Sequence, residues 1–230
     1  MSRTALLAGA SGLVGGHLLH LLLSDAAYAR VITLARRHLD VHHPKLDQRV
    51  VDLGELDALS DLPHVDDAFC CVGTTIKKAG SQEAFRRVDH DYVLGFARAG
   101  QRAGAGQFLL VSALGADPAS RIFYSRVKGE IEQAVRQLPF AGIQILRPSF
   151  LMGERTEVRL AERIGVPIAR ALAPLLFGPL RRYRPIDAAD VARAMVQIAK
   201  EAPRGPNVFE YDGIVVAATG AGRSSAHSSS

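Results

Sequence analysis

The segment that decides the fold is Leu6-Leu7-Ala8-Gly9-Ala10-Ser11-Gly12-Leu13-Val14-Gly15, an apolar run followed by glycines spaced three apart. The apolar run predicts a strand, and the leucines after Gly15 predict a helix. Gly9 permits a tight turn, Gly12 lets the backbone approach a pyrophosphate, and Gly15 lets the helix pack closely on the strand. Amides at the helix N-terminus then attract phosphate. A dinucleotide is therefore expected at Gly9, Ser11, Gly12, Leu13, Val14 and Gly15; the alternative is a tight turn without a ligand.

Short apolar runs alternate with helical periodicity over the first two-thirds of the chain. Such alternation predicts βαβ units and an α/β, doubly wound parallel sheet, the Rossmann fold. We expect one domain over residues 1–219, with a small C-terminal elaboration from about residue 148 and a disordered tail at 220–230. The predicted strands are Thr4–Ala8, Val31–Ala35, Arg49–Asp52, Ala68–Val72, Gln107–Ser112, Ile143–Arg147, Val208–Tyr211 and Ile214–Ala217, and the predicted helices are Leu13–Ser24, Ala84–Ala103, Arg121–Gln137 and Ala188–Lys200.

Composition and charge narrow the function classes. The chain has 230 residues, 48% of them hydrophobic, which suits a globular domain with a substantial core. The net charge is +5, but the 28 basic residues are scattered without a run of five, which indicates a solvated surface rather than a nucleic-acid site. The histidines lack spaced Cys, Asp or Glu partners, so no metal site is expected.

The two cysteines and two apolar stretches bear on the compartment. Cys70 and Cys71 are adjacent and are not expected to form a disulfide with each other, which favours a reducing cytoplasm. The N-terminal apolar run is interrupted by histidines, and the stretch Ile164–Leu180 is broken by prolines. We therefore expect no membrane span, and an amphipathic helix at a substrate or partner surface in the second stretch. A homodimer is left open.

The end of the second predicted strand selects the cofactor. Val31–Ala35 runs into Arg36 and Arg37, with no carboxylate before Asp40. An acidic residue at this place binds the ribose of NAD, whereas Arg accommodates a 2′-phosphate, so NADP(H) is favoured over NAD(H). Two solvated arginines are the alternative. Two further segments follow strand ends and are expected to contact the cofactor: Asp52 and Leu53 at the adenine, where Asp52 is equally suited to a turn, and Gly73, Thr74 and Thr75 at the ribose.

The stretch Tyr124-Ser125-Arg126-Val127-Lys128 predicts acid–base chemistry. Residues four apart lie on one face of a helix, so the ammonium of Lys128 is expected to lower the pKa of the Tyr124 phenol and to bind the nicotinamide ribose. Ser112 ends the fifth predicted strand, twelve residues before the tyrosine. We expect its hydroxyl to bind and orient the same substrate oxygen.

Taken together, these motifs resemble the atypical short-chain dehydrogenases/reductases, and most of all their Tat-interacting-protein oxidoreductase-like subgroup. The resemblance spans roughly residues 3 to 200 and rests on the glycine loop, the Ser112/Tyr124/Lys128 set, Cys71–Thr75, Val88–Val93 and Ser112–Asp117. It implies an NADP(H)-binding Rossmann fold, and it implies that Arg147 and Pro148 face the nicotinamide carboxamide. Asp89 stands where many members of the superfamily carry Asn.

Three functions are compatible with this pattern. The leading one is an NADP(H)-dependent oxidoreductase that moves hydride between nicotinamide and a small carbonyl or alcohol substrate, with the protein positioning the reactants. An epimerase/dehydratase-like enzyme of the same superfamily is an alternative, although 230 residues is short for a nucleotide-sugar enzyme. The third is a non-catalytic NADPH-binding sensor or scaffold.

Overall fold

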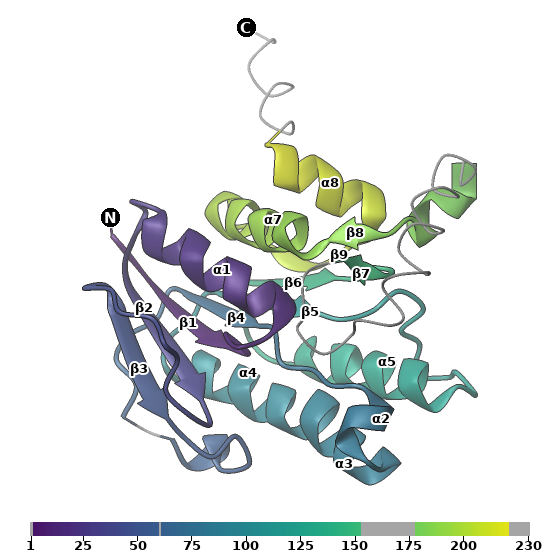
Figure 1. Ribbon diagram of the computed structural model, residues 1–230, viewed down its shortest axis with the longest axis horizontal. Coiled ribbons are helices and arrows are strands. Elements are labelled where there is room, and N and C mark those ends of the chain that lie inside the picture. Colours follow the sequence, from purple (N-terminus) through teal and green to yellow (C-terminus); the bar gives the residue numbers. More distant parts are fainter. Residues whose placement is uncertain (1, 60, 153–177, 221–230) are drawn as a thin grey trace, which may run out of the picture.

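A computed structural model describes residues 2–59, 61–152 and 178–220. Seven parallel strands form one sheet in the order β3-β2-β1-β4-β5-β6-β9, with helices on both faces (Figure 1), which confirms the predicted doubly wound α/β fold. The strands of this sheet are β1 (Arg3–Ala8), β2 (Tyr28–Ala35), β3 (Leu46–Val50), β4 (Asp67–Cys70), β5 (Gln107–Val111), β6 (Gly142–Leu146) and β9 (Gly205–Phe209), and a separate two-stranded ladder joins β7 (Leu151–Met152) to β8 (Ile186–Asp187).

The helices fall into two layers (Figure 1). One layer holds α1 (Leu13–Ser24), α7 (Ala188–Glu201) and α8 (Tyr211–Thr219); the other holds α2 (Ile76–Ala79), α3 (Gln82–Arg86), the π-helical turn η2 (Arg87–Asp91), α4 (Tyr92–Arg102) and α5 (Phe123–Val135). Two short 3-10 segments, η1 (Leu56–Ala58) and η4 (Gly178–Tyr183), lie in the connections.

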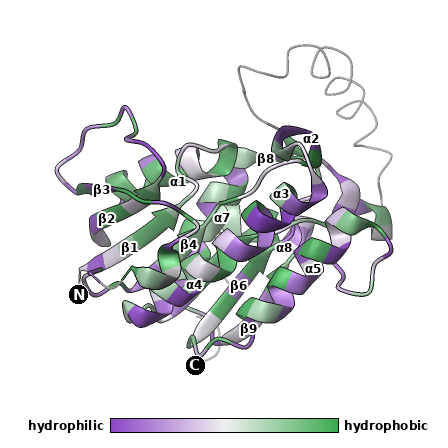
Figure 2. Ribbon diagram, turned by 90° about the horizontal axis from the view of Figure 1, so that it is seen from below, coloured by the Kyte–Doolittle hydropathy of each residue, from purple (hydrophilic) through white to green (hydrophobic). Residues whose placement is uncertain are grey.

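Each face of the sheet carries its own hydrophobic core. Along β1, Ala5 and Leu7 belong to the core that includes α1 and α7, whereas Leu6 and Ala8 belong to the core that includes α4 and α5. Because both faces of the strands are covered, their sequences read as continuous apolar runs rather than as alternation. Figure 2 shows β1 and β4 largely in the hydrophobic colour, between helices of mixed colour. Because all seven strands are parallel, their carboxyl ends share one edge of the sheet, which is where such sheets bind ligands.

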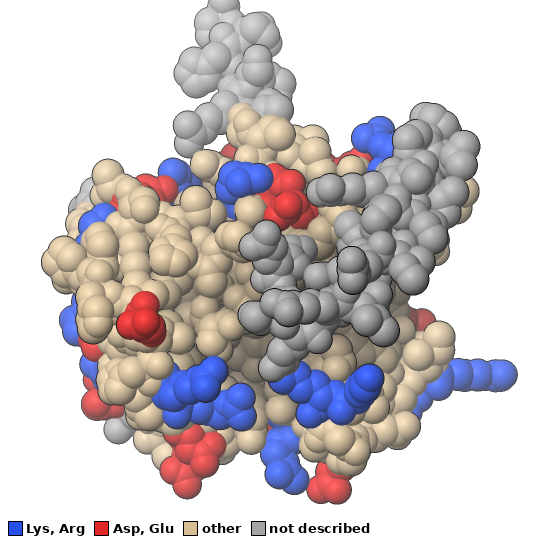
Figure 3. Space-filling view, in the orientation of Figure 1, with Lys and Arg blue, Asp and Glu red and all other residues tan. Residues whose placement is uncertain are grey.

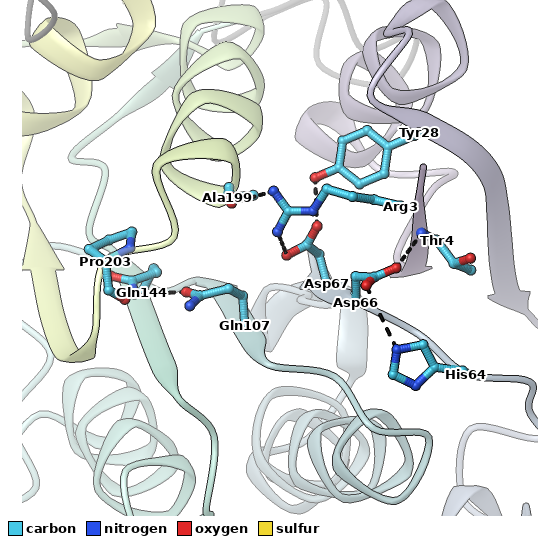
Figure 4. A network of polar contacts seen from close by, with 10 residues as sticks. All are labelled: Arg3, Thr4, Tyr28, His64, Asp66, Asp67, Gln107, Gln144, Ala199 and Pro203. Atoms are coloured by element: carbon cyan, nitrogen blue, oxygen red, sulfur yellow. Dashed lines mark hydrogen bonds and ion pairs between the residues drawn. The ribbon is translucent and has the colours of Figure 1, made fainter. Parts of the chain in front are cut away.

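A buried polar network joins elements at the opposite, amino-terminal edge (Figure 4). The fully buried carboxylate of Asp67 is 2.5 Å from Arg3 Nη2 and accepts a 2.8 Å hydrogen bond from the hydroxyl of Tyr28. Arg3 also donates to the carbonyl of Ala199 at 2.9 Å. Burial raises the pKa of Asp67 to about 6, against the lowering effect of Arg3. The network connects β1, β2, β4 and α7.

A second buried contact ties β9 to the sheet. Gln144 in β6 donates from Nε2 to the side-chain oxygen of Gln107 at 3.1 Å and to the carbonyl of Pro203 at 2.6 Å (Figure 4). Asn207 of β9 in turn donates to Gln144 Oε1 at 3.1 Å. These bonds fix the last strand beside β6.

The structure corrects several of the predicted elements. The segment Ile214–Ala217 is not a strand but part of α8, because its apolar side chains pack on α7 instead of pairing at a sheet edge. The third strand begins and ends earlier than Arg49–Asp52, and the single helix expected at Ala84–Ala103 is divided into α3, η2 and α4. The predicted amphipathic helix at Ile164–Leu180 lies largely outside the described residues, as does the tail beyond residue 220.

Three surface properties are also visible in the described part of the chain. Basic and acidic side chains are interspersed on the face shown in Figure 3. None of the helices in residues 2–59, 61–152 and 178–220 is both long and apolar enough to cross a bilayer. Within the same ranges, no three His, Cys, Asp or Glu side chains gather in a way that would hold a metal ion.

Candidate active site

The glycine loop connects β1 to α1 with little space for side chains. Gly9 has φ +85°, and a Cβ there would lie 2.4 Å from the carbonyl carbon of Cys71. A Cβ at Gly15 would lie 2.1 Å from the Gly9 carbonyl oxygen, so only glycine lets α1 pack this closely on the loop. Gly12 precedes the helix and its carbonyl accepts the first intrahelical bond, from Gly16, at 2.9 Å.

The first turn of α1 leaves donors for an anion. The amides of Leu13, Val14 and Gly15 come before the first intrahelical bond and have no carbonyl partner within the helix. Ser11 is exposed at the loop, and no acidic side chain lies in the first turn. Together with the helix dipole, these amides favour binding of a phosphate group.

The two neighbouring strand ends place the residues expected at the adenosine half. Arg36 and Arg37 follow β2 directly and are exposed, and neither forms an ion pair within the described ranges. Asp52 follows β3 and accepts a 2.8 Å bond from the amide of Gly54, which is the turn role that the sequence left open. Leu53 is half-buried and packs against the core that includes α4.

The segment after β4 approaches the centre of the site. Gly73 lies against Asp89, since a Cβ at the glycine would be 3.3 Å from Asp89 Oδ1 and 3.9 Å from Lys128 Nζ. The amide of Thr74 donates to Asp89 Oδ2 at 2.8 Å. Thr75 caps α2 by accepting from the amide of Lys78 at 3.1 Å. The three residues expected at the ribose therefore form a fixed loop.

Tyr124 and Lys128 lie one turn apart on α5, as expected from their spacing. The ring of Tyr124 packs against the buried ring of Phe85, with centroids 5.4 Å apart. Gly129 lets the preceding loop cross the helix, because a Cβ there would lie 2.1 Å from the nitrogen of Pro118. Lys128 is buried, and its Nζ is 2.7 Å from Asp89 Oδ1.

The electrostatics of Tyr124 differ from the expectation of a lowered pKa. Burial is the largest effect and raises the pKa of the phenol above its ordinary value. The charge of Lys128 lowers it, but the carboxylate of Asp89 opposes that effect. Considered alone, the lysine acts as predicted; burial of the phenol, with a smaller contribution from Asp89, reverses the net direction of the pKa shift.

Ser112 and Arg147 share a buried partner that the sequence did not single out. The hydroxyl of Ser112 donates to Glu132 Oε1 at 2.6 Å. Arg147 donates to the same carboxylate from Nε at 2.9 Å and from Nη2 at 2.5 Å. Glu132 is almost fully buried, and its carboxylate links α5 to the ends of β5 and β6.

A pocket of about 500 Å³ adjoins Arg147 at the carboxyl ends of β5, β6 and β9. Pro148, next to Arg147 in the chain, is buried, and its carbonyl accepts from the amide of Leu114 at 3.0 Å. The wall combines apolar, aromatic and charged side chains from separate segments, including Leu114, Phe150, Arg182, Tyr183 and Glu210.

The match to known proteins covers this whole arrangement. Residues 5–211 match the NAD dependent epimerase/dehydratase family, which includes every strand end described above. The chain belongs to this family. The resemblance to short-chain dehydrogenases/reductases is thereby confirmed, as is NAD(P) binding at the level of the family.

Sequence relatives extend the comparison. The protein FMP52, mitochondrial, of Coccidioides immitis is 34% identical over 220 residues, covering 89% of this chain and 88% of its own. The protein HTATIP2 of Rattus norvegicus is 37% identical over 165 residues, covering 70% and 68%. The fungal names contradict the predicted cytoplasmic location. That prediction rests on reduced thiols, which more than one compartment maintains.

Solved structures share the fold at low sequence identity. The human epimerase family protein SDR39U1 with NADPH has a TM-score of 0.63 at 18% identity, covering 90% of this chain and 74% of its own. A UDP-N-acetylglucosamine 4-epimerase from Methanobrevibacter ruminantium has a TM-score of 0.66 at 15% identity, covering 91% and 76%.

Proposed function

We propose that this chain is an NADP(H)-dependent oxidoreductase that transfers hydride between nicotinamide and a small carbonyl or alcohol substrate. The observation that carries the proposal is the placement of Tyr124 one helical turn from the buried cation Lys128, beside the loop that follows β4. A phenol next to a buried ammonium is suited to exchange a proton with a substrate oxygen.

The residues present fit a dinucleotide. The close packing at Gly9 and Gly15 and the free first-turn amides of α1 suit a pyrophosphate. The exposed guanidinium groups of Arg36 and Arg37, with no carboxylate at the same strand end, favour a 2′-phosphate and hence NADP(H). The neighbour SDR39U1 was solved with NADPH, which is compatible with this preference.

The chemistry is divided between cofactor and protein. A bound nicotinamide supplies or accepts the hydride. In this proposal Tyr124 exchanges the proton with the substrate oxygen, and Lys128, which is paired with Asp89, binds the ribose. Because the Ser112 hydroxyl donates to Glu132, its proton is engaged in this structure, and we assign the substrate proton to Tyr124 alone. Arg147 is likewise held by Glu132 and shapes the adjoining pocket.

An epimerase or dehydratase is the second candidate, favoured by the family to which the chain belongs. Such an enzyme would use the same cofactor site and the same tyrosine. The chain covers about three-quarters of the length of the nucleotide-sugar epimerase, at 76%.

The test combines cofactor binding with turnover. NADPH is expected to raise the melting temperature more than NADH at equal concentration, and the difference should vanish in an Arg36→Ser, Arg37→Ser double variant. Arg121→Ser serves as the control for loss of an exposed arginine elsewhere. Equal shifts by both cofactors in the parent protein would contradict the NADP(H) preference.

Turnover is measured as carbonyl-dependent NADPH oxidation over a panel of small aldehydes and ketones. Tyr124→Phe should lose it by at least about a hundredfold, the lower bound for general acid catalysis, while keeping the NADPH-induced thermal shift. Tyr211→Phe, on α8, is the matched control. Unchanged turnover in Tyr124→Phe would show that the tyrosine takes no part in the reaction. Conversion of a nucleotide sugar without net oxidation or reduction of the cofactor would favour the epimerase.

A further inference from the structure

The buried cation of the candidate site, Lys128, is paired with a carboxylate. Lys128 Nζ is 2.7 Å from Asp89 Oδ1, and the two side chains are 6% and 1% exposed. At this burial, water contributes little screening, so the carboxylate opposes the field of the ammonium at close range. The unit beside Tyr124 is therefore an ion pair with almost no net charge.

Asp89 is fixed independently of the lysine. Its second oxygen accepts the Thr74 amide at 2.8 Å, and Gly73 leaves just enough room for the carboxylate. The residue lies in η2, a π-helical turn that interrupts the α3–α4 helix; such turns commonly occur at functional sites. The position and charge of Asp89 are thus properties of the fold and do not depend on a bound substrate.

Two charged groups act on Tyr124: Lys128 on the same helix and Asp89 on η2. Cys70, at the end of β4, acts on Lys128. Burial raises the pKa of the Cys70 thiol to about 12, so this group is neutral at physiological pH. Phe85 of α3 contributes an apolar ring. Beside burial, the groups that influence ionisation of the phenol are therefore Lys128 and Asp89.

We propose that Asp89 is a positioning residue that opposes the field of Lys128 and helps to keep Tyr124 protonated, so that the resting site holds the proton that carbonyl reduction requires. This inference rests on the proposed oxidoreductase function. The raised pKa of Tyr124, to which Asp89 contributes, agrees with the geometry.

The reaction balances in that direction. The carbonyl carbon accepts hydride from the reduced nicotinamide, its π bond to oxygen breaks, and the oxygen takes the phenolic proton of Tyr124. A C–H and an O–H bond form, the cofactor is oxidised, and the phenolate is reprotonated by water. Alcohol oxidation needs the phenolate as base at the start, and a neutral ion pair beside a half-buried phenol disfavours that form.

The first experiment measures the phenol directly. The ultraviolet absorbance of phenolate is titrated in each variant and in the same variant carrying Tyr124→Phe, and the difference isolates this tyrosine from the other four. In the parent protein, Tyr124 should ionise at a higher pH than an ordinary tyrosine. Asp89→Asn should increase the phenolate fraction at a given pH about tenfold or more, because the lysine is no longer opposed.

Three variants separate charge from shape. Asp89→Glu keeps the charge and should titrate like the parent, whereas Lys128→Met should make the phenol harder to ionise. Asp91→Asn is the matched control, since it lies two residues away on the same turn and is 59% exposed. Opposite shifts for Asp89→Asn and Lys128→Met support the proposal. An unchanged titration in a folded Asp89→Asn variant overturns it, and if that variant does not fold, an unchanged titration in Lys128→Met does so.

A second readout uses turnover. In Asp89→Asn, the pH at which alcohol oxidation reaches half its maximum rate should fall, because Tyr124 reaches its phenolate form at a lower pH. The two proposals fail in different ways. A protein without turnover in either direction contradicts the oxidoreductase but leaves the titration to decide the charge effect, whereas turnover with an unaltered pH profile contradicts the role of Asp89 alone.

Discussion

Replacing Glu132 tests how the strand ends are held around the site. The carboxylate accepts from Ser112 and from two nitrogens of Arg147, and its side chain is only 3% exposed. Glu132→Gln keeps the volume and one acceptor but removes the carboxylate with which Arg147 forms its ion pair. Loss of one partner from a buried pair costs about 3 to 5 kcal/mol. Because the Arg147 side chain is 21% exposed, water can solvate its charge and reduce this cost. We therefore expect a loss of about 2 to 3 kcal/mol in the free energy of unfolding.

The matched control lies on the same helix. Glu130 pairs with Arg86, but the two side chains are 28% and 43% exposed, so Glu130→Gln should cost less than about 1 kcal/mol. Urea denaturation followed by circular dichroism measures both losses, and the slope with denaturant should stay the same. A double variant, Glu132→Gln with Arg147→Met, should lose at least about 1 kcal/mol less than the sum of the single variants.

The reasoning depends on the difference in burial between two similar ion pairs. If Glu132→Gln and Glu130→Gln lower the free energy of unfolding equally, within about 0.5 kcal/mol, burial of the pair does not govern its contribution and the argument is refuted.

Three further perturbations have definite expected outcomes. Ser112→Ala should lower the free energy of unfolding by about 1 kcal/mol in urea melts, since one hydrogen bond is lost, and should change carbonyl turnover by less than about threefold; a hundredfold loss would place its hydroxyl on the substrate. The pKa of Asp67 is raised to about 6 from 3.8, so its contribution to stability is complete below the lower value and is lost as pH rises through the upper one. The parent protein should therefore lose about 3 kcal/mol relative to Asp67→Asn between pH about 4 and 6.5, measured as the difference between their stability curves, and parallel curves would contradict this sign. Gly15→Ala should cost about 1 to 3 kcal/mol and abolish the NADPH-induced thermal shift, because its Cβ would meet the Gly9 carbonyl, whereas Gly16→Ala, 3.6 Å from its nearest neighbour, should melt like the parent.

Local sequence signals predicted much of the fold. The start of α1 follows from the glycine loop and its end from Ser24 and Asp25, and α7 begins one residue after Asp187, which caps it by accepting from the Ala189 amide. The strand predicted at Ile214–Ala217 was wrong. Its β-branched residues are typical of strands, but packing on α7 decides the conformation of the segment. Its helical state is a tertiary effect that no local pattern carries.

The site shows the same division. The spacing of Tyr124 and Lys128 is a local signal and predicts their common helix face. Asp89 comes from a separate helix, and its contact with Lys128 depends on the π-helical turn, which has no recognised sequence pattern. Glu132 could have been predicted from the sequence, since it lies one further turn along the helix face that carries Tyr124 and Lys128. A buried carboxylate at that spacing calls for a cationic partner, which the structure provides in Arg147.

The late arrival of α7 and β9 has a consequence during synthesis. Arg3 in the first strand bonds to Ala199, 196 positions later, and the same helix covers α1. At about 5 to 20 residues per second, the ribosome needs roughly 10 to 40 s between these two residues.

Throughout that interval, the apolar face of α1 has no α7 to cover it, and β6 presents an unpaired edge until Gly205–Phe209 emerges. The nascent chain therefore exposes an apolar helix face and an unpaired strand edge, both of which are covered in the folded protein. Its yield in a cell should depend on how well chaperones occupy them before the last strand closes the sheet.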